Sequence, residues 1–328
     1  MSVRVGIIGL GIIGGVHLDA LLKTEGAQVV AVCDTERSRA EAAAAKSRLG
    51  GQVGATAHIN FRTMLEREPL DALYVCLPPF AHSEVELLAA QKGIHLFIEK
   101  PIALSAERAG QIAAELHKAG IITSVGYTWR YFSRVDETRA FLKDRLIALI
   151  AGEWLSTMPG APWWREREKS GGQVVEQVTH LFDLGRLFCG EVDTVFAASF
   201  RGIMAKKADR HTVDDADAVA LKFRSGVAGC FCSSNAAPVS LGASLRILAE
   251  DAVVVVNSKG VEIIEKGRRS VMDHEGDPYV AEARCFIEAV QKKDPSLVKS
   301  NYADALQTLK LTLAVQKSAD TNKPVTLA

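Results

Sequence analysis

Three ionisable side chains near the middle of the chain are spaced for acid–base chemistry. Glu176, His180 and Asp183 stand at positions i, i+4 and i+7 of a segment with a helical pattern, so they are expected on one helix face. A histidine flanked by two carboxylates can be held in one tautomer and can accept a proton from an alcohol. A buried structural histidine and a metal site are the alternatives. Because Glu176 and His180 are too few ligands for zinc and no Cys or His partners stand nearby, we expect no metal.

A second constellation, near the N-terminus, has the pattern of a phosphate-binding loop. The apolar run 3–8 is typical of a strand and leads into Gly9-Leu10-Gly11-Ile12-Ile13-Gly14, a G-x-G-x-x-G. The first glycine permits a tight turn, the second lets the backbone approach a pyrophosphate, and the third brings the helix close to the strand. The phosphates would face the N-terminus of the following helix, where Ile12 and Ile13 stand.

An acidic residue completes this pattern. A second apolar strand, residues 28–32, runs into Asp34, twenty residues past Gly14. Asp34 can accept hydrogen bonds from the two hydroxyls of an adenosine ribose and would repel a 2′-phosphate, so we predict NAD as the cofactor rather than NADP. A glycine-rich turn in some other α/β protein is the alternative.

Lys100 stands where the apolar strand 94–98 ends, between Glu99 and Pro101. A lysine that is partly desolvated beside the positive nicotinamide ring would have a lowered pKa. It could then polarise or deprotonate a substrate hydroxyl. A surface lysine in a strand-to-helix loop is the alternative. Pro101 would fix the turn, through a cis or a trans bond.

The elements around these residues predict a doubly wound parallel sheet over residues 1–126. Strands alternate with helices, and runs such as 72–77 are continuously apolar, as in parallel sheets. A surface helix over 36–49 should end at Gly50-Gly51, and another helix should begin at Ser83. The carboxyl ends of parallel strands form the edge where ligands bind. The residues that we expect at this edge to bind the cofactor are Gly9, Gly11, Ile12, Ile13, Gly14, Asp34, Leu77, Pro78, His82, Glu99 and Lys100.

Residues 127–328 predict a second domain of α+β type. A helix over 174–188 carries Glu176 and His180, and helices are expected over 134–144, 278–290 and 302–318. Strands with short connecting turns are expected at 147–156, 193–201, 216–223, 227–234, 243–249 and 252–257. Such spacing favours a large, mostly antiparallel open sheet with helices on one face. Because the other face needs a cover, we expect a homodimer or homotetramer through this sheet.

Aromatic and arginine side chains gather in loops that should face the ligand crevice. Aromatic faces stack on the C–H faces of sugars, and arginines reach hydroxyls or carboxylates. Half or more of these side chains would serve ordinary packing. The candidate substrate-binding residues, besides Lys100, Glu176 and His180, are Tyr127, Trp129, Arg130, Trp163 and Trp164.

Composition excludes several classes of partner. The 328 residues contain 39 Lys plus Arg and 39 Asp plus Glu, so no overall charge attracts nucleic acid or an anionic membrane. No apolar run reaches transmembrane length without a charge or a turn. The six cysteines show no C-x-x-C pairing and look like buried thiols of a reducing compartment, so we expect a cytoplasmic protein.

The combined motifs resemble the glucose–fructose oxidoreductase / inositol dehydrogenase / rhizopine-catabolism (Gfo/Idh/MocA) oxidoreductases over essentially the whole chain. The resemblance rests on Gly9–Gly14 with His17, on Glu99-Lys100-Pro101, and on Gly171-Gly172 followed by Glu176, His180 and Asp183. It implies a nicotinamide cofactor and hydride transfer to or from a polyol carbon, with Lys100 and His180 as the catalytic pair. The family usually has Asp where this chain has Glu176 and Gly where it has Val178, which implies a pocket different from that of typical inositol dehydrogenases.

We therefore predict an NAD-dependent dehydrogenase of a sugar, an inositol or a related polyhydroxy compound. His180 would be the general base, Lys100 would assist it, and Glu176 would orient the substrate or the histidine. Two alternatives stay open: an NAD-dependent glycoside hydrolase on the same scaffold, with no net redox change, and a non-catalytic sensor that binds NAD or a sugar.

Overall fold

The computed structural model describes residues 2–49, 54–82 and 84–327. The helix end expected at Gly50-Gly51 and the helix start expected at Ser83 lie outside these residues. The chain divides into two compact units. The first comprises Met1–Tyr131 and Gly276–Leu306, and the second comprises Phe132–Glu275 and Gln307–Ala328. The predicted division at residue 126 differs from this chiefly in residues 276–306, which belong to the first unit.

The first unit contains the predicted parallel sheet. Within the described residues its strands are ordered β3-β2-β1-β4-β5-β6, all parallel to their neighbours. The order reverses between β1 and β4, which makes the carboxyl ends of these two strands the place for a ligand crevice. The strands are β1 (Val3–Ile8), β2 (Ala27–Cys33), β3 (Thr56–His58), β4 (Ala72–Val75), β5 (His95–Ile98) and β6 (Thr123–Val125).

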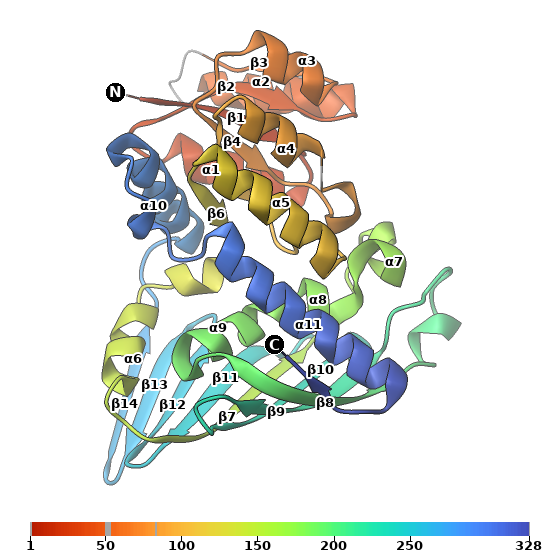
Figure 1. Ribbon diagram of the computed structural model, residues 1–328, viewed down its shortest axis with the longest axis vertical. Coiled ribbons are helices and arrows are strands. Elements are labelled where there is room, and N and C mark those ends of the chain that lie inside the picture. The colour runs from red at the N-terminus through yellow and green to blue at the C-terminus, as the bar shows by residue number, and fades with distance from the viewer. Residues whose placement is uncertain (1, 50–53, 83, 328) are drawn as a thin grey trace. The chain divides into compact units, whose positions relative to one another are not determined.

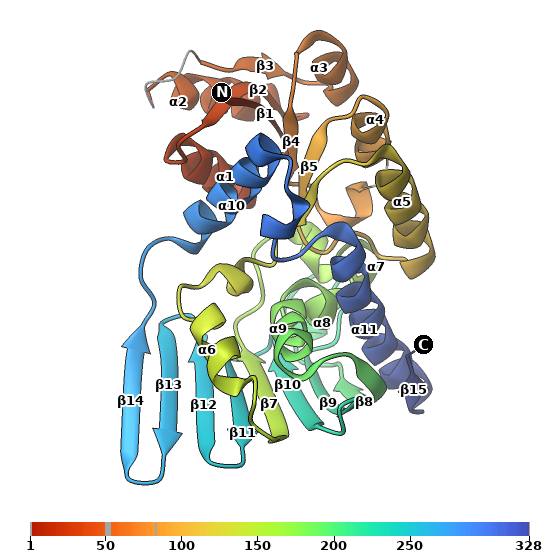
Figure 2. The same cartoon turned by 60° about the vertical axis from the view of Figure 1, so that its left-hand side comes forward.

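Helices cover both faces of this sheet, as expected for a doubly wound fold (Figures 1 and 2). One core joins the strands to α1 and α2, while α4 and α5 pack side by side on the other face. The elements of this unit are α1 (Ile12–Leu22), α2 (Arg37–Leu49), α3 (Phe61–Arg67), α4 (Glu84–Gln91), α5 (Ala106–Ala119) and α10 (Pro278–Lys292), with short 3₁₀ turns η1 (Pro79–Ala81), η2 (Thr128–Tyr131) and η5 (Pro295–Leu297).

Helix α10 joins the first unit because the sheet carries an aromatic face that needs a cover. The rings of Tyr74 on β4 and Phe97 on β5 stack with centroids 4.4 Å apart. The ring of Phe286 on α10 packs edge-on against both, with centroids 5.7 Å from that of Tyr74 and 5.9 Å from that of Phe97. Ala283 and Ile287 extend the same core. The amphipathic pattern of 278–290 predicts the helix correctly, but it carries no information on which sheet the helix covers.

The second unit is built on a mixed sheet ordered β14-β13-β12-β11-β7-β10-β9-β8-β15. β7 and β10 pair in parallel, and the other neighbours pair antiparallel, so the predicted mostly antiparallel sheet is confirmed. The strands are β7 (Ile147–Leu155), β8 (Val192–Phe200), β9 (Ala216–Phe223), β10 (Ala228–Ser234), β11 (Gly242–Ala249), β12 (Ala252–Asn257), β13 (Gly260–Glu265), β14 (Arg268–Asp273) and β15 (Val325–Thr326). The hairpin β13–β14 was not predicted because charged residues interrupt its apolar alternation.

Helices lie on one face of this sheet (Figures 1 and 2). Along β9, Val219, Leu221 and Phe223 are buried toward the helices, whereas Ala218 and Ala220 are exposed on the opposite face. The helical elements are α6 (Val135–Leu142), α7 (Arg167–Ser170), α8 (Gly172–Glu176), α9 (Thr179–Cys189), η3 (Pro162–Arg165), η4 (Met204–Lys206) and α11 (Tyr302–Thr321), whose first residues belong to the first unit. Among the described helices, none is long and apolar enough to span a membrane.

A buried acid on α10 makes the stability of the first unit sensitive to pH. Glu282 is fully buried and accepts a hydrogen bond from the Thr128 hydroxyl at 3.1 Å. Burial, reinforced by the negative charge of Glu99, raises the pKa of Glu282 well above the ordinary range of a glutamate. The folded state therefore keeps a proton that the unfolded chain releases, and stability falls as the pH rises above the unfolded-state pKa.

We expect Glu282→Gln to remove much of this decline, because glutamine resembles the protonated acid in shape but cannot ionise. The free energy of unfolding, measured in urea at pH 6 and pH 9, should fall less between these values in the variant than in the wild type. Glu288→Gln, at a partly exposed position of the same helix, is the control and should leave the wild-type pH dependence. An equal decline in Glu282→Gln and wild type would show that Glu282 is ionised in the folded protein.

Candidate functional site

The glycine loop after β1 is shaped by close backbone contacts. A Cβ atom on Gly9, whose φ is +85°, would lie 2.3 Å from the carbonyl oxygen of Cys76, and one on Gly14 would lie 1.9 Å from the carbonyl oxygen of Gly9. Both positions therefore require glycine. Gly11, in contrast, has no atom within 4 Å of the Cβ position and begins α1 without a capping side chain. This leaves open space beside the N-terminus of α1, where a phosphate would find backbone N–H groups.

Asp34 lies next to this loop and holds it. Its Oδ2 accepts a hydrogen bond from the backbone N–H of Leu10 at 2.8 Å, and its Oδ1 accepts one from that of Glu36 at 2.9 Å. Each carboxylate oxygen can accept a second hydrogen bond, so these contacts leave acceptor capacity for ribose hydroxyls. The uncapped helix, the open space at Gly11 and the acid at Asp34 together fit a dinucleotide.

The loop after β4 is held by His82. Its Nε2 lies 2.9 Å from the carbonyl oxygen of Leu77, and its Nδ1 lies 2.6 Å from a carboxylate oxygen of Glu86 on α4. Because both ring nitrogens are engaged, His82 fixes the Leu77-Pro78 turn at the crevice edge.

A buried carboxylate fixes the backbone of Lys100. Glu99 is 3% exposed; its Oε1 lies 2.7 Å from Nε2 of His17 on α1, and its Oε2 accepts the backbone N–H of Lys100 at 3.0 Å. A Cβ on Gly126 would come within 2.7 to 3.0 Å of this carboxylate, so Gly126 makes room for it. The Lys100-Pro101 bond is cis. These contacts orient the start of the turn that carries the Lys100 side chain.

In the second unit the predicted single helix over 174–188 is wrong. α8 ends at Glu176 and α9 begins at Thr179. Between them the N–H of Val178 bonds to the carbonyl of Gln173, five residues back, which is a π-type turn. The simple i, i+4 spacing therefore does not describe how Glu176 and His180 lie.

The surroundings of Glu176 and His180 include two tryptophans. The indole N–H of Trp164 donates to Oε2 of Glu176 at 2.9 Å. The ring of Trp154 on β7 lies nearly parallel to that of His180, with centroids 6.2 Å apart. Trp154 was not among the predicted site residues, because nothing in the sequence around a single tryptophan in a strand indicates that its ring packs beside His180. Asp183 is fully buried and accepts a hydrogen bond from Thr308 at 3.1 Å.

The predicted site residues thus fall into two groups. The first unit contains the predicted cofactor residues and also Lys100, Tyr127, Trp129 and Arg130. The second unit contains Trp163, Trp164, Glu176 and His180. The guanidinium of Arg130 is held by Asp304 at 2.7 Å and by the carbonyl of Lys299. Among the described residues, no group of three or more His, Cys, Asp and Glu side chains is arranged to hold a metal ion.

Comparison with known proteins identifies the family and the fold of this chain. Residues 3–127 match the model of the oxidoreductase family with an NAD-binding Rossmann fold, GFO_IDH_MocA, and residues 147–256 match the GFO/IDH/MocA C-terminal domain. A myo-inositol 2-dehydrogenase of Thermotoga maritima is 27% identical over 99% of this chain and 98% of its own length. An inositol 2-dehydrogenase of Rhizobium meliloti is 26% identical over the full length of both. The structure of a levoglucosan dehydrogenase in complex with NADH and levoglucosan covers the whole of both chains with a TM-score of 0.88 at 19% identity, a likeness of fold.

The space at Gly11 predicts the effect of a single methyl group. Gly11→Ala should keep the melting temperature of the wild type, because φ is −69° and no atom lies within 4 Å of the new Cβ. The methyl group should instead obstruct the pyrophosphate and raise the Kd for NAD by about tenfold or more. Isothermal titration calorimetry measures this.

Gly15→Ala is the matched control, since its Cβ also meets nothing within 4 Å but lies further along α1. It should keep both stability and affinity. If Gly11→Ala binds NAD as tightly as Gly15→Ala, the phosphates do not approach Gly11.

Proposed function

Because the chain belongs to the Gfo/Idh/MocA oxidoreductase family, we propose that it is an NAD-dependent dehydrogenase of a sugar, an inositol or a related polyhydroxy compound. The observation that carries the proposal is the position of Lys100. It follows β5 at the same carboxyl edge of the sheet as Gly9 and Asp34, and Glu99 fixes its backbone. The backbone that carries the lysine side chain is thereby held at the edge where the dinucleotide loops lie. The inositol dehydrogenases among the relatives support the class of substrate.

Oxidation of an alcohol removes a hydride from carbon and a proton from oxygen. NAD⁺, when bound, supplies the hydride acceptor, C4 of the nicotinamide. His180 accepts the proton from the substrate hydroxyl, and Lys100 assists by donating a hydrogen bond as negative charge develops on the substrate. Glu176 accepts a hydrogen bond from a substrate hydroxyl or orients His180.

The remaining predicted residues support these roles. Gly9, Gly11, Ile12, Ile13, Gly14 and Asp34 bind the cofactor directly, whereas His82 and Glu99 act through the loops that they hold at Leu77, Pro78 and Lys100. Tyr127, Trp129 and Trp163 supply aromatic faces toward a polyol, whereas Trp164 contributes through its hydrogen bond to Glu176. Arg130 contributes by fixing the turn of Trp129, since Asp304 and Lys299 occupy its guanidinium.

We also propose that the uncovered face of the second sheet joins copies of this chain, as a homodimer or homotetramer. Small side chains gather there, among them Ala198, Ala218, Ala220, Cys230 and Cys232, and Phe196 is 41% exposed beside them. Two charged side chains of opposite sign, Glu153 and Arg246, line the same surface. A second copy that covers this face must therefore pair these charges as well as bury the small side chains.

Lys100→Met and His180→Asn should each lower kcat about a hundredfold or more, the size expected for loss of acid–base catalysis. Both should keep the Kd for NAD, because the dinucleotide loops are unchanged. The assay is the change in nicotinamide absorbance with NAD⁺ or NADP⁺ over a panel of inositols, aldoses, sugar acids and glycosides. Lys118→Met, at an exposed position of α5, is the control.

Full activity in both variants would refute the assigned roles. A wild-type protein that cleaves a glycoside without net production of NADH would favour the hydrolase instead, and one that binds NAD but turns over nothing on the panel would favour a sensor.

Ala220→Glu should dissociate the oligomer, because it places a charge in the middle of the exposed sheet face. Light scattering after size-exclusion chromatography should give the monomer mass for this variant and a multiple of it for the wild type. Ala114→Glu makes the same change on the exposed side of α5 and should not alter the mass. A wild-type protein of monomer mass would refute the interface.

A further inference from the structure

A buried tryptophan, Trp164, contacts Glu176, one of the proposed site residues of the second unit. Trp164 is only 2% exposed, and its indole N–H donates to Oε2 of Glu176 at 2.9 Å. Indole has a single polar hydrogen and no acceptor, so a buried tryptophan depends on one partner for its N–H. Glu176 is that partner.

The contact depends on the length of the acidic side chain. Aspartate at position 176 would withdraw the carboxylate by one C–C bond, about 1.5 Å. The distance between the indole nitrogen and the nearest oxygen would then leave the range of a hydrogen bond, unless the turn of Trp164 moved. The pairing of tryptophan at 164 with glutamate at 176 is therefore specific to the longer acid.

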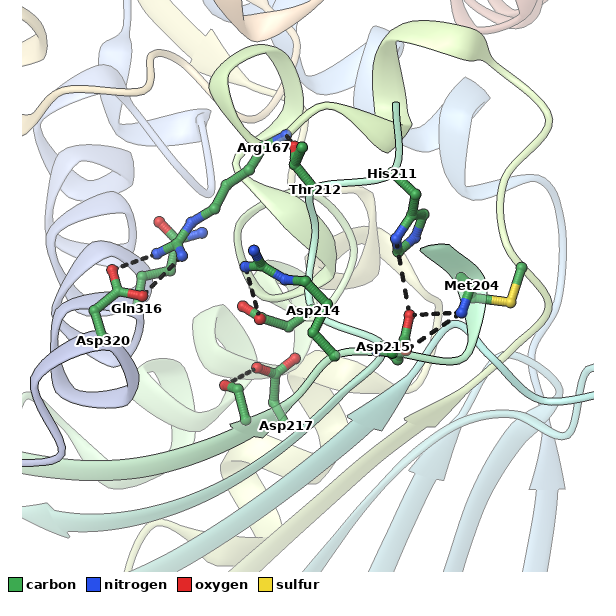
Figure 3. Close-up of polar contacts among 12 residues, drawn as sticks. Arg167, Met204, His211, Thr212, Asp214, Asp215, Asp217, Gln316 and Asp320 are labelled. Carbon is green, nitrogen blue, oxygen red and sulfur yellow. Dashed lines mark hydrogen bonds and ion pairs between the residues drawn. The ribbon is translucent and has the colours of Figure 1, made fainter. Parts of the chain in front are cut away.

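The turn of Trp164 is tied down on its C-terminal side. The carbonyl of Arg165 accepts the backbone N–H of Thr212 at 2.9 Å, and the hydroxyl of Thr212 accepts the backbone N–H of Arg167 at 2.8 Å. The guanidinium of Arg167 makes two hydrogen bonds to Asp320 on α11, at 2.8 and 2.6 Å (Figure 3).

The segment that carries Thr212 is itself anchored by a buried acid. Asp215 has no exposed surface, and its Oδ2 accepts the backbone N–H groups of Gly202 and Ile203 at 2.7 and 2.6 Å. In Figure 3 its carboxylate points toward Met204 and His211, at the base of the loop between β8 and β9. Trp164 thus lies on a turn that is attached to two other elements of the unit, and it cannot readily follow a shorter acid.

We propose that Trp164 is a positioning residue that sets substrate specificity through Glu176. By holding Oε2, it fixes the plane of the carboxylate and so the direction in which Glu176 accepts a hydrogen bond from a substrate hydroxyl. This rests on the proposed function, since it gives Glu176 a role toward a polyol. The pair selects substrates whose hydroxyl meets a carboxylate at the reach of a glutamate side chain, one methylene further from the backbone than an aspartate would place it.

A double-mutant cycle tests the proposal on the full-length protein. Trp164→Phe should lower kcat/KM for the polyol by about tenfold, the order expected for one hydrogen bond to a charged group, mainly through KM and with the Kd for NAD unchanged. Glu176→Asp should cause a similar loss, and the double variant should lose no more than Glu176→Asp alone. The matched background is Glu176→Gln, which keeps the length and a carbonyl acceptor, so Trp164→Phe should still raise KM there. Equal losses from Trp164→Phe in the wild-type and Glu176→Asp backgrounds would overturn the proposal.

A second readout does not depend on turnover. The chain has four tryptophans, so its indole N–H groups give few resonances in a ¹⁵N NMR spectrum, and Trp164→Phe assigns one of them. That resonance should shift in Glu176→Asp and less in Glu176→Gln. If the wild type turns over no polyol, the proposed function fails, but the resonance still tests the contact between Trp164 and Glu176. An unchanged signal in Glu176→Asp refutes the contact. A shift in Glu176→Asp that is larger than the shift in Glu176→Gln supports it.

Discussion

The buried carboxylate of Glu99 is the contact on which the first unit's site depends. It joins α1 through His17 to the backbone of Lys100 at the end of β5, and the absence of a side chain at Gly126 gives it space beside β6. The helix proposed to face the dinucleotide phosphates and the turn that carries Lys100 are therefore held by one side chain. Removing the imidazole of His17 would leave one oxygen of a buried carboxylate without its hydrogen bond, which costs more than the hydrogen bond itself contributes.

Much of the first unit could be predicted from the sequence because its signals are local. The glycine spacing, the apolar strands and Asp34 lie within a few dozen residues of one another. For Gly9 and Gly14 the structure supplies the steric reason, since a Cβ at either position would collide with the backbone. The placement of α10 could not be predicted, since its contact with Tyr74 and Phe97 joins residues about two hundred positions apart. Amphipathic patterning identifies a buried face but not the surface that buries it.

The sequence predicts Glu176 and His180 as site residues of the second unit, but it does not predict the turn that lies between them. That prediction rests on their spacing along one helix, yet a π-type turn at Val178 interrupts the helix. Helical periodicity cannot reveal one inserted residue. The partners of these side chains, Trp164 and Trp154, come from a loop and a strand, and such tertiary contacts leave no mark in the sequence around Glu176.

The discontinuity of the first unit bears on the order in which the chain can fold during synthesis. A nascent chain that has reached Glu275 contains strands β1 to β14, but not Phe286 or its neighbours on α10. Until α10, which ends at Lys292, leaves the ribosome, the rings of Tyr74 and Phe97 lack their cover. The domain that begins first is thus completed late, and its exposed aromatic face in the interval is the kind of surface that chaperones shield.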